Sequence, residues 1–74
     1  MKKNDNLAKL GDGIRLERLK QKLSQQELAE KAGIAQYQQI GRIERAEINT
    51  SVTTLFAILK ALNCKLENII DLKE

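Results

Sequence analysis

Two helix signals near the middle of the chain, a start and a stop, limit its fold more than any other feature. Ser24 to Glu27 (SQQE) has the order of a capping box, in which the serine hydroxyl and the glutamate carboxylate each accept a hydrogen bond from the other residue's amide. Gly33 follows as a stop, because glycine adopts the left-handed backbone that closes a helix. The two signals predict a helix of about two turns that starts at Gln25. Its inner face consists of Leu28, Ala29 and Ala32.

A second short helix is predicted directly after this glycine, from about Gln36 to Glu44. Its apolar side consists of Tyr37, Ile40 and Ile43, which recur every three residues. The other sides hold glutamines and Arg42, and these side chains hydrogen-bond the edges of adenine and guanine. Two short helices joined by a glycine turn form a helix-turn-helix, whose second helix enters the major groove of DNA. The sequence therefore predicts such a motif over residues 25–44.

The N-terminal segment predicts a further helix from about Leu7 to Lys22. Gly11 and Gly13 each cost about 1 kcal/mol inside a helix, so we expect regular helix only after Asp12. The inner face consists of Leu7, Leu10 and Ile14. Leu16 and Leu19 project from the opposite side, where they can contact a second layer or a partner.

The C-terminal part of the chain predicts a loop and two more helices. Residues 45–50 show no periodicity, Ser51 caps the fourth helix and Asn63 ends it. Lys65 to Leu72 predicts a short fifth helix whose surplus apolar residues, Ile70 and Leu72, suggest a symmetric contact with a second copy. The apolar stripe of the fourth helix consists of Val52, Leu55, Phe56, Ile58, Leu59 and Leu62. We therefore expect one compact all-α domain of five helices over residues 1–74.

Composition excludes most kinds of enzyme and metal site. Histidine is absent and Cys64 is the one cysteine, which removes disulfides, zinc sites and the common catalytic triads and dyads. We expect no enzyme activity, no metal and no cofactor, and we interpret Cys64 as a buried structural thiol. The sequence contains neither a signal peptide nor an apolar run that could span a membrane, so we expect a soluble, cytoplasmic protein.

Charge is distributed unevenly along the chain. Residues 1–45 contain ten Lys and Arg against six Asp and Glu, whereas residues 46–74 contain three against four. The N-terminal part, which includes the predicted motif, is therefore the candidate surface for a polyanion.

Three segments show a family resemblance that spans nearly the whole chain: Leu23 to Gly33 (LSQQELAEKAG), Ile40 to Glu47 (IGRIERAE) and Ile48 to Leu62 (INTSVTTLFAILKAL). They resemble the Cro/C1-type helix-turn-helix family, also called the Xre family, of phage repressors and bacterial regulators. The resemblance implies a fold like that of the lambda repressor and sequence-specific binding to double-stranded DNA. It further implies a transcriptional regulator, expected to be a repressor, that binds a palindromic operator as a homodimer.

The resemblance also assigns roles to single residues. Gln25 takes the place of a phosphate-binding glutamine, Ala29 that of a small residue where two helices cross, and Arg18 and Glu44 that of a structural ion pair. The expected base contacts are Gln36, Tyr37, Gln38 and Arg42. The expected phosphate contacts are Ser24, Gln25, Gly41, Arg45, Asn49, Thr50 and Ser51. Ile70 and Leu72 remain the expected dimer contacts.

Two departures from the family pattern affect these assignments. Gly33 lies seven residues before Ile40, where the family has six, so one extra residue stands in the turn or in the first helical turn. Counting from Gly33 makes Gln36 and Tyr37 the first base contacts, whereas counting from Ile40 makes them Tyr37 and Gln38. Ala46 and Lys22 replace common glycines, and a left-handed backbone at Ala46 would cost about 1 kcal/mol.

A second function is compatible with the same fold. The two departures, the low net charge of +3 and the apolar outer side of the first helix also fit a protein-interaction module. An antitoxin that neutralises a partner protein is one example.

Overall fold

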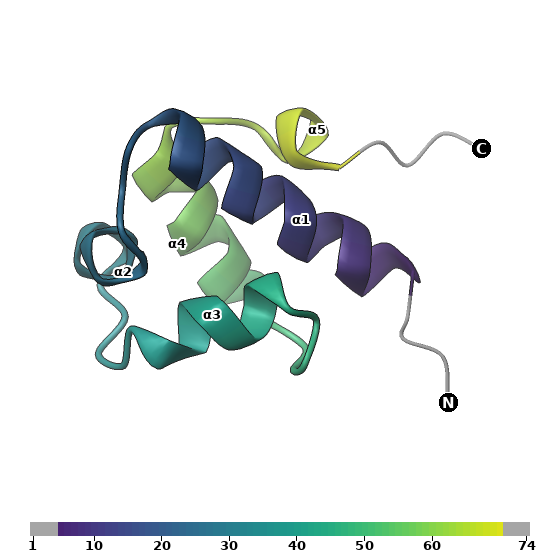
Figure 1. The fold of residues 1–74 in the computed structure, drawn as a ribbon, viewed down its shortest axis with the longest axis horizontal. Helices are drawn as coiled ribbons and strands as arrows, with labels where there is room; N and C mark the ends of the chain where they lie inside the picture. The colour runs from purple at the N-terminus through teal and green to yellow at the C-terminus, as the bar shows by residue number, and fades with distance from the viewer. Residues whose placement is uncertain (1–4, 71–74) are drawn as a thin grey trace.

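The computed structural model describes residues 5–70, which form five helices (Figure 1). The helices are α1 (Asp5–Lys20), α2 (Gln25–Ala32), α3 (Gln38–Glu44), α4 (Val52–Leu62) and α5 (Leu66–Ile69). Helix α2 packs against α3 and α4, while α1 packs against α3 and α5. Figure 1 shows α3 and α5 on opposite sides of α1. The all-α class and the five helices predicted from the sequence are confirmed.

Every helix contributes apolar side chains to the core. The buried apolar residues are Leu10, Ile14, Leu28, Ala29, Ile40, Ile43, Ile58, Leu59, Leu62, Ile69 and Ile70. Ala29 is 2% exposed, in agreement with the small residue expected between crossing helices. None of the helices within residues 5–70 is long and apolar enough to cross a membrane. Over the same residues, metal-binding side chains do not gather in groups of three or more.

Side chains cap the N-termini of α2 and α4 as predicted. The Glu27 amide donates to Ser24 Oγ at 2.9 Å, and the Ser24 amide donates to Glu27 Oε1 at 2.7 Å, which completes the capping box. The Thr54 amide donates to Ser51 Oγ at 3.1 Å at the start of α4. These bonds satisfy amides that have no acceptor within the helix.

Helices α1 to α4 all end in the same way, with one residue in the left-handed conformation. These residues are Lys22 (φ 60°), Gly33 (φ 73°), Ala46 (φ 59°) and Asn63 (φ 53°). After each, the next amide donates to a carbonyl five residues back, as in the bond of 2.9 Å from the Glu47 amide to the Arg42 oxygen. Such a bond, made directly after a left-handed residue at the end of a helix, is characteristic of the Schellman motif. Three of the four ends therefore place a non-glycine residue where glycine fits best.

The expectation that regular helix begins after Asp12 is wrong, because α1 runs from Asp5 through both glycines. The two glycines allow close packing. A methyl group on Gly11 would lie 2.5 Å from the Ile43 oxygen and 2.6 Å from the Glu44 oxygen, and one on Gly13 would overlap the Ile69 oxygen. The absence of side chains at these positions lets α1 approach the end of α3 on one side and α5 on the other.

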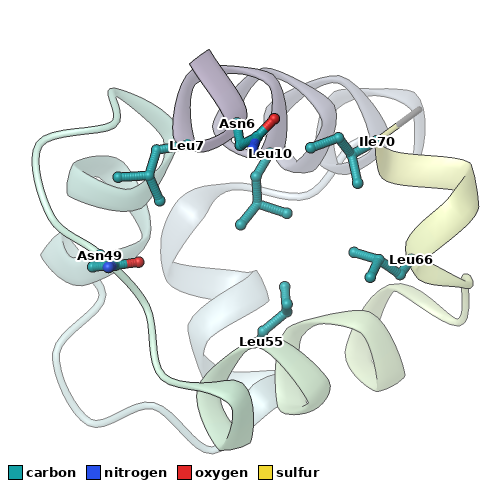
Figure 2. Close-up of a pocket in the computed structure, with 7 residues that line it drawn as sticks. All are labelled: Asn6, Leu7, Leu10, Asn49, Leu55, Leu66 and Ile70. Carbon is teal, nitrogen blue, oxygen red and sulfur yellow. The ribbon is translucent and has the colours of Figure 1, made fainter. Parts of the chain in front are cut away.

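The predicted bounds of two other helices also differ from the structure. Helix α3 begins at Gln38 rather than Gln36, although it ends at Glu44 as predicted. Helix α5 is shorter than predicted, since it ends at Ile69 and Ile70 is extended. Ile70 is 8% exposed and lines an open hollow of about 340 Å³ with Leu7, Leu10, Leu55 and Leu66 (Figure 2). Leu72 lies outside the described residues.

The apolar stripe predicted on α4 divides into a buried and an exposed part. Ile58, Leu59 and Leu62 are buried, whereas Val52 is 66% exposed and Phe56 is 60% exposed. The predicted stripe therefore faces the core only in part, and Val52 and Phe56 lie on the surface. On α1, Leu16 and Leu19 are exposed as predicted, to 62% and 46%.

Candidate nucleic-acid interface

The outward face of α3 is polar. Gln38 and Arg42 stand one turn apart and Arg45 follows three residues later, so these side chains share one side of the helix. All three are exposed, while Ile40, Ile43 and Glu44 are buried on the opposite side. Helix α3 thus rests on the core through its apolar side and presents an amide and two guanidinium groups outward.

The segment from Gly33 to Ile40 contains the residues whose register the sequence leaves open. Residues 33–37 connect α2 to α3, and Tyr37 immediately precedes α3 with right-handed backbone angles, φ −65° and ψ −24°. Tyr37 is 43% exposed, and Gln36 is exposed in the turn. The candidate first base contacts of the two registers, Gln36, Tyr37 and Gln38, are therefore all exposed.

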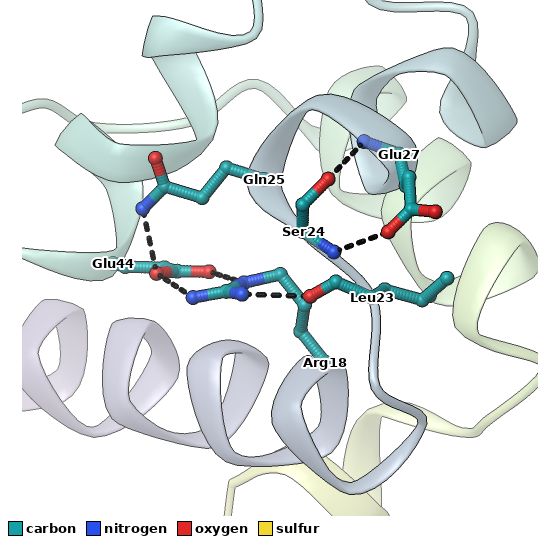
Figure 3. Close-up of polar contacts among 6 residues, drawn as sticks. All are labelled: Arg18, Leu23, Ser24, Gln25, Glu27 and Glu44. Carbon is teal, nitrogen blue, oxygen red and sulfur yellow. Dashed lines mark hydrogen bonds and ion pairs between the residues drawn. The ribbon is translucent and has the colours of Figure 1, made fainter.

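A buried ion pair ties the end of α3 to α1. Arg18 Nε donates to Glu44 Oε2 at 2.7 Å and Arg18 Nη2 donates to Glu44 Oε1 at 3.0 Å, with side chains 8% and 2% exposed. Arg18 Nη1 also donates to the Leu23 oxygen at 2.8 Å (Figure 3). The ion pair expected from the family resemblance is therefore present, and its guanidinium fixes the segment that leads into α2.

Gln25 completes this network from the first turn of α2. Its Nε2 donates to Glu44 Oε1 at 3.2 Å (Figure 3). The Glu44 carboxylate on α3 thus accepts hydrogen bonds from side chains of both α1 and α2. The network holds Gln25 beside α3.

Gln25 and Arg45 meet above Gly41. A methyl group on Gly41 would lie 3.0 Å from Arg45 Nη1, 3.1 Å from Gln25 Oε1 and 3.2 Å from Gln25 Nε2. Gly41 is buried beneath these two side chains. Its role in the structure is to make room for two polar groups, so a direct phosphate contact by Gly41 would require both side chains to move.

Arg45 lies in the loop after α3 and is paired with Glu47. Its Nε donates to Glu47 Oε2 at 2.7 Å, and its Nη2 donates to Glu47 Oε1 at 3.4 Å. The hydrogen bonds to Glu47 raise the pKa of the exposed Arg45 guanidinium above its ordinary value. This partner was not predictable from the sequence, because oppositely charged residues two apart in a loop form a pair only if the backbone turns.

The remaining predicted phosphate contacts have structural roles of their own. The hydroxyls of Ser24 and Ser51 cap helices, and Asn49 Oδ1 accepts a hydrogen bond of 3.1 Å from the Thr50 amide. Asn49 also lines the hollow at Ile70 (Figure 2). Thr50 is half-buried. The structure therefore brings Gln25 and Arg45 together beside α3 and leaves Asn49 to Ser51 in the loop that leads into α4.

Cys64 and Ile70 lie away from this surface. Cys64 is half-buried against the core, and desolvation raises the pKa of its thiol. Ile70 belongs to the core of one chain and has little surface left for a second copy. The structure thus agrees with a structural thiol, although Cys64 is less deeply buried than predicted.

Comparison with known proteins identifies the fold and the family. The sequence model of the helix-turn-helix family matches residues 14–69. Among solved structures, the chain is similar to the restriction-modification controller protein C.AhdI from Aeromonas hydrophila, with a TM-score of 0.84 and 27% identity. The match covers 90% of this chain and 100% of that chain. None of the curated proteins matches this sequence.

The family match includes α2, α3 and the turn between them, where the exposed amide and guanidinium groups described above lie. The structural match extends the likeness to the arrangement of all five helices, which is that of the lambda repressor. Proteins of this family are DNA-binding transcription regulators and not enzymes. The chain therefore belongs to the Cro/C1-type helix-turn-helix family of DNA-binding regulators.

Proposed function

We propose that the chain is a repressor that binds a palindromic operator as a two-fold dimer, with α3 in the major groove. The observation that supports this most is the outward face of α3, where Gln38 and Arg42 stand one turn apart above a buried apolar side. A glutamine amide pairs with adenine and a guanidinium with guanine. Tyr37 and Gln36 add contacts where α3 enters the groove.

In this proposal the DNA backbone contacts α2, the end of α3 and the loop that follows α3. Gln25 and Arg45, which meet above Gly41, are the main phosphate contacts in this proposal. The amides that open α2 add hydrogen-bond donors at the positive end of its dipole. Residues 49–51 and Ser24 would contact the backbone through the loop and the caps. Such contacts fix the register of α3 without reading sequence.

The size of the molecule supports two copies on one face of DNA. Its extents are 32 × 24 × 22 Å, so two neighbouring copies fit half-sites whose centres are about 34 Å apart, one turn of DNA. Exposed Val52 and Phe56 lie one turn apart on α4 and offer apolar surface for this contact. Ile70 and Leu72 remain expected dimer contacts from the C-terminal end of the chain. Because Ile70 is buried, its side chain offers little area for this contact.

The likeness to C.AhdI supports a regulator that acts through this fold alone. The matched region covers 100% of that controller, so the shared helices make up the whole of that chain. We propose a comparable role here, in which occupation of an operator controls a nearby promoter.

Selection of bound duplexes from a random DNA pool, followed by sequencing, tests the proposed function. We expect enrichment of a palindrome whose half-sites are about one helical turn apart. Sedimentation of the wild-type chain and of a Phe56→Ser variant tests the dimer, with Leu16→Ser as the matched control on α1. Recovery of random sequence, or of a single asymmetric site, would argue against the proposal.

One observation favours a second candidate function. Leu16 and Leu19 are exposed and lie three residues apart on α1, so they share one side of this helix. An antitoxin-like module would bury this surface against a partner protein. The same random-pool selection separates the candidates, because a module that kept this fold but lost affinity for DNA would enrich no DNA sequence.

A further inference from the structure

Arg45 is the one proposed phosphate contact that already binds a carboxylate within its own loop. Its guanidinium donates two hydrogen bonds to Glu47, at 2.7 Å and 3.4 Å, and the two side chains are 56% and 50% exposed. A guanidinium binds a phosphate through the same donors that it uses for a carboxylate. Glu47 therefore occupies donors that a DNA phosphate would need.

The turn at Ala46 explains why these two side chains meet. Ala46 is left-handed, and the Glu47 amide donates back to the Arg42 oxygen at 2.9 Å, which folds the chain sharply after α3. Arg45 and Glu47 flank this residue. The geometry of the helix end thus holds the carboxylate beside the guanidinium at the C-terminal end of α3.

Other charged groups lie close to Arg45 and Glu47. Arg45 and Glu47 line a hollow of about 420 Å³ together with Asp12, Arg15 and Glu44. The Glu44 carboxylate receives its hydrogen bonds from Arg18 and Gln25. Asp12 lies on α1, three residues from Arg15. The Glu47 carboxylate accepts hydrogen bonds from Arg45 Nε and Nη2.

We propose that Glu47 competes with DNA phosphate for Arg45. The affinity for DNA is therefore lower than it would be without the Glu47 carboxylate. The proposal rests on the proposed function, because it assumes that Arg45 faces the DNA backbone. On binding, the guanidinium exchanges the carboxylate for a phosphate, and the carboxylate is left close to the polyanion. Both effects weaken the complex, and both depend on the charge of Glu47.

Binding to a labelled duplex of mixed sequence tests the proposal, since phosphate contacts are independent of sequence. Four proteins are compared with the wild-type chain: Glu47→Gln, Arg45→Gln, the double variant and Glu67→Gln. Glu67 is an exposed residue of α5, on the opposite side of α1 from α3 (Figure 1), so its substitution changes net charge equally without touching the loop. Melting temperatures of Glu47→Gln and the wild-type chain should be similar, because exposed pairs contribute little to stability.

We expect Glu47→Gln to bind about three- to tenfold more tightly than Glu67→Gln at low salt, with a salt dependence steeper by about one counterion. This gain should vanish when Arg45 is also replaced. Equal affinities of Glu47→Gln and Glu67→Gln, or a gain that persists without Arg45, would overturn the proposal and leave DNA binding intact. If the wild-type chain shows no salt-dependent binding to duplex DNA, the proposed function fails and this inference fails with it.

Discussion

Arg18 on α1 and Glu44 at the end of α3 form a buried ion pair joined by two hydrogen bonds, at 2.7 Å and 3.0 Å. Glu44 also receives the Gln25 side chain from α2, and Arg18 also donates to the Leu23 oxygen. Within the described residues, no buried side-chain polar atom lacks a partner. The pair therefore sets the position of α3 relative to both α1 and α2.

Removal of one partner of this pair should be strongly destabilising. Arg18→Ala leaves a buried carboxylate without its counter-charge, so we expect a loss of about 3 to 5 kcal/mol in the free energy of unfolding. Urea denaturation measures this loss. Glu47→Gln, which breaks an exposed pair, is the control and should change stability by less than about 1 kcal/mol. A similar small change for both variants would mean that the Arg18 pair does not hold the fold.

Glycine at position 46 should stabilise the protein. Ala46 is left-handed, with φ 59°, and an L-residue pays about 1 kcal/mol for that conformation. We expect Ala46→Gly to raise the free energy of unfolding by about 0.5 to 1 kcal/mol, and Lys22→Gly to act in the same direction. Ala57→Gly, inside α4, is the control and should cost about 1 kcal/mol. Destabilisation by Ala46→Gly would contradict the left-handed turn.

A methyl group at position 11 should disturb the contact between α1 and α3. In Gly11→Ala the new Cβ would lie 2.5 Å from the Ile43 oxygen, which belongs to a backbone that cannot yield without moving α3. We expect a loss of about 1 to 3 kcal/mol in thermal or urea unfolding, together with weaker DNA binding. Asp12→Ala, at the exposed neighbouring position, is the control and should stay close to wild type.

Acid should weaken the start of α2 through Glu27. Hydrogen bonds from Ser24 lower the pKa of the Glu27 carboxyl from 4.5. A lowered folded pKa means that the cap stabilises the fold fully above the unfolded pKa and is lost as the pH falls through the folded value. We expect the stability difference between the wild-type chain and Glu27→Gln to shrink on acidification below about pH 4.5. A difference that is constant with pH would exclude a role for the ionised cap.

Helix ends were predictable from sequence where local chemistry determines them. Ser24 and Ser51 cap their helices, and Gly33 and Asn63 end theirs, because these interactions involve residues close together in the chain. The pair of Arg18 and Glu44 joins residues far apart in sequence, and its prediction depended on the family resemblance. Periodicity alone would not have shown it.

Predictions failed where tertiary contacts outweigh local preference. Gly11 and Gly13 reduce helix propensity, yet they lie inside α1, because close packing against α3 and α5 favours residues without side chains. Phe56 and Val52 fit an apolar stripe but are exposed, since α4 turns only part of that stripe toward the core. The spacing of Gly11 and Gly13 indicates close helix packing, whereas helix propensity alone predicted a helix boundary there.

One affinity ratio tests the central claim most directly. It compares the affinity for the selected operator with that for a mixed-sequence duplex, and it is measured for the wild-type chain and for Arg42→Ala at one salt concentration. Arg42 is exposed on α3, so its removal should leave the fold intact while lowering this ratio about five- to 150-fold, the effect of one base contact of roughly 1 to 3 kcal/mol. Lys60→Ala, an exposed cation on α4, should leave the ratio unchanged. An equal loss of affinity on both DNAs for Arg42→Ala would contradict base reading by α3.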